Sequence, residues 1–188
     1  DPEMSRGLGD VYKRQDDYRA QMFRYTNSFK EARFLRAYFY FNLVRAYGDV
    51  PYFTEMVTTD QVNSLTRTPA QEIFNAIIAE CDKLSTELPA DYTKLGLDGI
   101  APAENGRVTC YAALALKARA ALYAASLLFN PGNNKDLWRR AAEANKEVIE
   151  TCTANGFKLS KYSELWGPNN WSNNEMIFVR RYNGNIST

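Results

Sequence analysis

The amino-acid sequence predicts a mainly all-α protein in which antiparallel helices pack as pairs, with irregular loops and a short extended segment near the C-terminus. Four stretches place apolar residues at helical spacing, and each one is followed by Gly, Pro or an Asn-Pro-Gly triplet. The last of these helices begins like the first half of a tetratricopeptide unit. The connections suit antiparallel neighbours, so we predict tetratricopeptide-like helix pairs.

The most apolar stretch, residues 29–47, predicts the helix around which the others pack. Asn27 and Ser28 are suitable N-cap residues, and the Glu31 carboxylate lies where it can reach back to the cap. Gly48 and Pro51 mark its end. Because residues 34–44 are apolar on nearly all sides, we expect a central helix covered by neighbours.

Charged side chains on this helix point in two directions. Arg33 and Arg36 lie on one side, whereas Glu31 and Arg45 lie on roughly the opposite side. An unpaired buried charge is costly, so we expect some of these groups to pair with carboxylates or carbonyls between helices.

The residues before this helix form two parts. Residues 1–15 show no helical or strand period, and we interpret them as a non-native or disordered leader. Residues 16–188 are expected to form a single, incomplete helical domain. Residues 16–26 suit a short helix, and the sequence leaves open whether it breaks at Asn27 or fuses with the helix that follows.

Three further helices are expected. Thr68 as N-cap and Pro69 as first residue begin a helix that runs to about Leu88. An Ala-rich core helix covers residues 109–129, and Asn134 caps a helix over residues 135–153. Residues 158–174 look irregular, and residues 176–180 suit a strand or a buried extended piece.

Composition excludes several classes of function. The formal net charge is +1 with both signs mixed throughout, so no basic face for nucleic acid is evident. The chain has no His, which excludes Ser-His-Asp triads, Cys-His pairs and the usual zinc sites within it. Its three cysteines, Cys81, Cys110 and Cys152, suit either buried small side chains or one bridge plus a free thiol.

Three segments resemble, in order, signature segments of the SusD/RagB family. They are residues 31–51 (EARFLRAYFYF, then LVRAYGDVP), residues 106–119 (GRVTCYAALALKAR) and residues 174–178 (NEMIF). We interpret the motif residues as structural; these are Glu31, Arg33, Arg36, Arg45, Gly48, Asp49, Pro51 and Arg107.

The resemblance implies a surface lipoprotein of the outer membrane that binds a nutrient, usually a glycan. It also implies delivery to a SusC-like TonB-dependent transporter, without catalysis and with no cofactor. Members are longer than this chain, so the resemblance implies an interior piece without its lipid anchor or C-terminal region.

The candidate sugar-binding residues lie in one loop and are Trp166, Asn169, Asn170 and Trp171, with Asn173 and Asn174 beside them. Aromatic faces suit the C–H surface of a sugar, and amides suit its hydroxyls. Alternatively, the tryptophans plug the end of the helical layer and the asparagines form turns. Tyr52, Tyr92 and Tyr182 are weaker candidates.

Two other functions remain open from the sequence. A helical adaptor would bind a peptide or protein partner in a concave groove. A glycosidase would need a pair of carboxylates, and no pair stands out among the many Asp and Glu residues. No catalytic motif is present, so we predict a binding protein rather than an enzyme.

Overall fold

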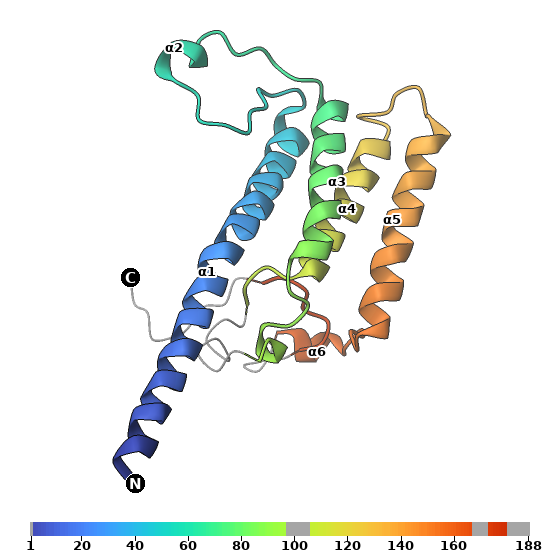
Figure 1. The fold of residues 1–188 in the computed structure, drawn as a ribbon. Helices are drawn as coiled ribbons and strands as arrows, with labels where there is room; N and C mark the ends of the chain where they lie inside the picture. The colour runs from blue at the N-terminus through green and yellow to red at the C-terminus, as the bar shows by residue number, and fades with distance from the viewer. Residues whose placement is uncertain (1, 97–105, 167–172, 180–188) are drawn as a thin grey trace.

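The computed structural model describes residues 2–96, 106–166 and 173–179 (Figure 1). Its elements are α1 (Pro2–Tyr47), α2 (Thr59–Val62), α3 (Ala70–Glu87), the 3-10 helix η1 (Tyr92–Lys94), α4 (Cys110–Ala125), α5 (Lys135–Ala154) and α6 (Tyr162–Leu165). These residues form no strand, only an isolated bridge between Val50 and Thr68. The predicted all-α class is confirmed. None of the described helices is long and apolar enough to cross a membrane.

The four long helices alternate in direction (Figure 1). Helix α3 packs against α1 and α4, and α4 packs in turn against α5. The loops after α1 and α4 therefore lie at one end of the helices, and the loops after α3 and α5 lie at the other. This arrangement agrees with the predicted antiparallel pairs.

Aromatic and aliphatic side chains of α1 and α3 meet the small side chains of α4 in one core. The fully buried members include Phe34, Phe41, Val44, Ile73, Phe74, Ile77, Ala113, Ala120 and Ala125. The alanine side chains at the facing positions of α4 occupy little volume. The helix axes can therefore approach closely while the phenylalanine rings of α1 and α3 still fit between them.

Helix α1 is continuous through the position where the sequence suggested a cap. Asn27 is buried and donates from Nδ2 to the Glu31 carboxylate, while the Ser28 hydroxyl donates to the Tyr25 carbonyl. Neither residue caps a helix, so of the two alternatives left open by the sequence the fused one is observed, and residues 16–26 belong to the same helix. The helix also includes residues 2–15. It ends before Gly48, whose φ of +70° favours glycine.

The outer side of α1 departs from the prediction of a helix covered all round. Among the helices, α3 and α4 pack against one side of α1. On the other side the loop after α1 covers Tyr40 through the rings of Tyr52 and Phe53. Exposed apolar side chains follow the other side, and we call them the outer row of α1: Tyr18, Met22, Tyr25, Phe29, Phe39, Leu43 and Tyr47.

Two helix ends also differ from expectation. The first N–H of α3, on Ala70, donates to the Asp49 carboxylate at 2.7 Å, so Asp49 rather than Thr68 caps this helix. Helix α4 ends at Ala125 rather than Phe129, because Ser126 is extended and its hydroxyl donates to the Tyr123 carbonyl. The predicted cap of α5 is confirmed, since Asn134 accepts from the Asp136 N–H.

The described part of the C-terminal segment is irregular and forms no strand. Ile177 packs against the core, and the ring of Phe178 meets the ring of Phe34 edge-to-face with centroids 5.5 Å apart. This contact holds residues 173–179 across the end of the helices, next to the loops that follow α3 and α5.

Candidate functional site

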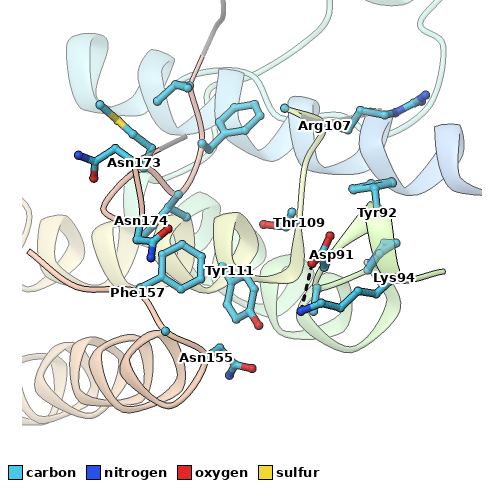
Figure 2. Close-up of a pocket in the computed structure, with 18 of the residues that line it drawn as sticks. Asp91, Tyr92, Lys94, Arg107, Thr109, Tyr111, Asn155, Phe157, Asn173 and Asn174 are labelled. Carbon is cyan, nitrogen blue, oxygen red and sulfur yellow. Dashed lines mark ion pairs between the residues drawn. The ribbon is translucent and has the colours of Figure 1, made fainter. Parts of the chain in front are cut away.

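A cleft of about 770 Å³ lies at the end of the helices where the loops after α3 and α5 meet. Residues from four segments line it: 89–95, 106–111, 155–157 and 173–179 (Figure 2). Its volume falls in the range of small-molecule binding pockets. We treat this cleft as the candidate site.

Two aromatic rings form the centre of the cleft. Tyr111, in the first turn of α4, meets Phe157, which follows α5, with ring centroids 4.8 Å apart and planes at 62°. Burial raises the pKa of the Tyr111 hydroxyl, so it stays protonated at neutral pH. Asn155 and Asn174, both exposed, line the cleft near this ring pair (Figure 2). The combination offers an apolar face beside hydrogen-bonding groups.

The opposite wall contains one carboxylate, that of Asp91. It accepts from the hydroxyl and the N–H of Thr93, at 2.6 and 2.9 Å, and pairs with Lys94 at 3.3 Å. The Thr93 hydrogen bonds and the Lys94 ammonium hold the pKa of Asp91 below its ordinary value. Asp91 therefore shapes the turn at η1 rather than standing as a free base.

A buried polar network holds this wall against α1. Arg107 pairs with Glu31 through two hydrogen bonds, Nε to Oε1 at 2.8 Å and Nη2 to Oε2 at 2.7 Å. The Tyr92 hydroxyl accepts from Asn27 Nδ2 at 2.9 Å and lies 2.7 Å from the Val108 carbonyl, to which it donates. Burial, the largest cause, raises the pKa of Tyr92 well above its ordinary value. The loops on both sides of residues 97–105 are thus fixed to one helix.

The third wall is held by a separate set of hydrogen bonds. The Glu175 carboxylate accepts from the Ser160 N–H at 2.8 Å, and Asn173 Oδ1 accepts from the Ser160 hydroxyl and the Glu175 N–H, both at 2.8 Å. These bonds join the segment after α5 to residues 173–175. They position Asn174 and Met176 at the cleft.

No group of three or more potential metal ligands occurs among the residues that the structure describes. The cleft contains a single carboxyl side chain in its described lining. The two cationic side chains of the lining, Lys94 and Arg107, are each paired with a carboxylate. The cleft therefore suits a neutral, hydroxyl-rich ligand better than a metal ion or a strongly charged one.

Of the sugar-binding residues predicted from the sequence, only part can be placed. Trp166 is 70% exposed, lies edge-to-face with Tyr162 and does not line the cleft. Its exposure contradicts the alternative in which it plugs the helical layer. Asn173 and Asn174 do line the cleft. The other predicted residues, Asn169, Asn170, Trp171 and Tyr182, lie outside the described residues.

The weaker tyrosine candidates occupy different places. Tyr92 lines the cleft, but its hydroxyl is used in the network beneath it. Tyr52 is half-buried and does not line the cleft. Its ring lies 4.7 Å from that of Tyr40, and burial raises the pKa of the Tyr52 hydroxyl.

The arginines of the first motif have three kinds of partner. Arg33 bonds to two α3 carboxylates, Glu80 and Glu87, both at 2.6 Å. Arg36 donates to the Thr54 carbonyl at 3.0 Å. Arg45 is exposed, and its guanidinium lies over the Phe41 ring at 5.9 Å. None of them reaches the cleft.

Sequence reasoning missed Tyr111, Phe157 and Asn155. Tyr111 lies inside an Ala-rich helix and was grouped with its core. The Asn155-Gly156-Phe157 triplet gave the one usable signal, because a helix end followed by an amide and an aromatic side chain places both at a loop.

Comparison with known proteins identifies what the chain resembles. A SusD-like family model described as "Starch-binding associating with outer membrane" matches residues 10–122. SusD-like protein P2 of Formosa agariphila is 28% identical over 162 residues, which cover 84% of this chain and 28% of that protein.

Solved structures give the same result. A SusD-like protein from Bacteroides fragilis matches with a TM-score of 0.63 and 28% identity, over 84% of this chain and 27% of the other. A SusD-like carbohydrate-binding protein from the same organism matches with a TM-score of 0.60 and 28% identity, over 79% and 26%. The chain therefore spans about a quarter of the length of each of these proteins.

Proposed function

The chain belongs to the SusD-like family of starch-binding, outer-membrane-associated proteins, and we propose that it takes part in binding a glycan without cleaving it. One of the similar solved proteins is named a carbohydrate-binding protein, which supports this class of ligand. The observation on which the proposal depends is the Tyr111–Phe157 ring pair flanked by side-chain amides.

The cleft matches the chemistry of a sugar. A pyranose ring has apolar C–H faces that pack on aromatic rings, and hydroxyls that both donate and accept. Phe157 supplies the exposed part of such a face, and Asn155 and Asn174 each supply a donor and an acceptor. Lys94, 82% exposed at its side chain, adds a donor at the rim.

The same lining supports binding rather than hydrolysis. Glycoside hydrolysis in most families uses two carboxyl groups on opposite sides of the scissile bond. Asp91 is the single carboxyl group in the described lining, and hydrogen bonds from Thr93 already engage it. We therefore propose that the bound glycan leaves the site unchanged.

We further propose, from family membership, that the whole protein is a surface-exposed lipoprotein. It would pass its ligand to a SusC-like TonB-dependent transporter in the outer membrane. Detection of the protein on intact cells, and its co-purification with a large β-barrel transporter, would test these two points.

Binding can be tested by isothermal titration with starch oligosaccharides and a panel of other glycans. Phe157→Ala should weaken binding by about tenfold or more, because it removes the ring surface. Trp166→Ala is the matched control, since Trp166 is an exposed aromatic residue outside the cleft. Equal affinity of Phe157→Ala and wild type would contradict the cleft proposal.

The control also tests the site predicted from the sequence. Loss of binding in Trp166→Ala, with Phe157→Ala unaffected, would place the ligand at the loop that contains Trp166 and Trp171. Release of reducing sugar by the wild type would contradict the non-catalytic proposal.

A helical adaptor for a peptide or protein is the second candidate. The observation in its favour is the outer row of α1, whose apolar side chains are exposed; Phe39, for example, is 59% exposed. Binding of peptides but of no glycan in the same titrations would support it.

A further inference from the structure

Helices α4 and α5 are antiparallel neighbours, and their contacts define which residues lie at the same level. Lys117 Nζ of α4 lies 2.7 Å from Glu147 Oε2 of α5. Further toward the start of α4, Tyr111 meets Phe157, just beyond the end of α5. Moving toward the N-terminus of α4 therefore corresponds to moving toward the C-terminus of α5.

This register brings two cysteines to the same level. Cys110 precedes Lys117 by about 10 Å of helix, and Cys152 follows Glu147 by about 8 Å. The two residues thus lie within a single helical turn of each other along the pair, one at the start of α4 and one in the last turn of α5.

Both side chains are also turned toward the packed interior. Cys152 is 7% exposed and follows Ala141 and Ala144 on the buried stripe of α5. Cys110 is partly buried and packs against the main core. Burial raises the pKa of both thiols, and the Cys152 thiol adds to the rise at Cys110, as expected for groups that are close together.

We propose that Cys110 and Cys152 form a disulfide that joins α4 to α5 beside the cleft. The bond would fix the aromatic pair from both sides. Cys110 precedes Tyr111 in the chain, and the Cys152 carbonyl accepts the Phe157 N–H at 3.0 Å. Cys81 is not a competing partner, because its neighbour Asp82 pairs with Lys117, about two turns away along α4.

The bond forms by exchange with a low-molecular-weight disulfide. The partly exposed Cys110 thiolate attacks one sulfur of that disulfide, forms a mixed disulfide and releases one thiol. The Cys152 thiolate then attacks the Cys110 sulfur and releases the second thiol. The two cysteines lose two electrons and two protons, and the reagent's disulfide is reduced to two thiols.

The test uses the folded chain incubated with oxidised glutathione, followed by mass spectrometry of the intact chain and of its peptides. We expect a loss of about 2 Da and one cross-linked peptide pair containing Cys110 and Cys152. Cys81→Ser should give the same result, whereas Cys110→Ser and Cys152→Ser should give no intramolecular bond. The oxidised chain should also unfold at a temperature roughly 5 to 15 °C higher than the reduced chain.

A parallel reaction in denaturant controls for the intrinsic reactivity of the thiols. It should yield all three pairings, because the unfolded chain imposes no register. The proposal is overturned if the folded chain keeps both thiols free, retains bound glutathione, or links Cys81 to either partner. If Cys81→Ser does not fold, the peptide map of the wild type decides between these outcomes.

Discussion

Removing the carboxylate of Glu31 should destabilise the chain more than any exposed charge would. Glu31 accepts hydrogen bonds from Arg107 Nε and Nη2 and from Asn27 Nδ2, and the Tyr92 hydroxyl lies 3.1 Å from it. The carboxylate thus links α1 to two of the segments that line the cleft, 89–95 and 106–111.

The magnitude follows from burial. The side chains of Glu31 and Arg107 are 15% and 30% exposed. Breaking a fully buried pair costs about 3–5 kcal/mol, and the partial exposure of Arg107 lets water replace part of the loss. We expect Glu31→Ala to lower the free energy of unfolding by about 3 kcal/mol, and Glu31→Gln by about 2 kcal/mol, since the amide oxygen still accepts.

The assay is urea unfolding followed by far-ultraviolet circular dichroism. Glu150→Ala on α5 is the matched control, because Glu150 also lies on a helix and pairs with Lys146 at 3.7 Å with both side chains largely exposed. This control should change stability by no more than about 0.5 kcal/mol. The double variant Glu31→Ala/Arg107→Ala should show a coupling energy of about 1–2 kcal/mol.

Two results would refute the reasoning. One is a cost for Glu31→Ala that matches that of Glu150→Ala. The other is strict additivity of Glu31→Ala and Arg107→Ala, which would mean that the two side chains do not stabilise each other.

Three further predictions concern other described residues. Burial raises the pKa of Cys81 to about 12, so Ellman's reagent should react with it only after unfolding; fast reaction in the folded chain would contradict its burial. Asp49→Ala removes the acceptor of the Ala70 N–H and should cost about 1 kcal/mol in urea unfolding, with Asp49→Asn retaining most of the stability. The pKa of Asp91 is lower in the folded chain than its ordinary value, chiefly because of the hydrogen bond from the Thr93 hydroxyl. The ionised Asp91 carboxylate therefore stabilises the fold at pH values above its ordinary pKa, and this stabilisation is lost as the pH falls through the lowered pKa of the folded chain. Unfolding midpoints measured from about pH 6 to 2 should therefore fall less in Asp91→Asn than in the wild type, and parallel curves would contradict this.

Helical period and strong stop signals were enough to predict the fold class and most helix bodies. The helix ends were less predictable, because distant residues decide them. Asn27 is a good cap by residue type, yet Tyr92 and Glu31 bind its amide inside a continuous helix. Asp49 caps α3 from another loop, and local sequence around Thr68 contains no sign of it.

The candidate site was harder to predict for a related reason. Its residues come from four segments, and only their spatial convergence makes a cleft. Tyr111 belongs to the core by its neighbours in sequence and to the cleft by its position in the first turn of α4. The loop predicted as the sugar site from its Trp and Asn content contains Trp166 among the described residues. Trp166 does not line the cleft.

The arrangement also separates residues that hold the cleft from residues that would contact a ligand. Glu31 does not line the cleft and holds its wall through Arg107, which does line it, whereas Asn155 and Phe157 come from the loop after α5 and line the cleft directly. Substitution of the network should lower both the free energy of unfolding and ligand affinity, since the wall depends on it. Substitution of Asn155 should lower affinity alone, because the hydrogen bond of its side chain to the Thr151 carbonyl is exposed and local. If Asn155→Ala and Glu31→Ala instead changed stability and affinity in the same proportion, the cleft would be a consequence of packing rather than a binding site.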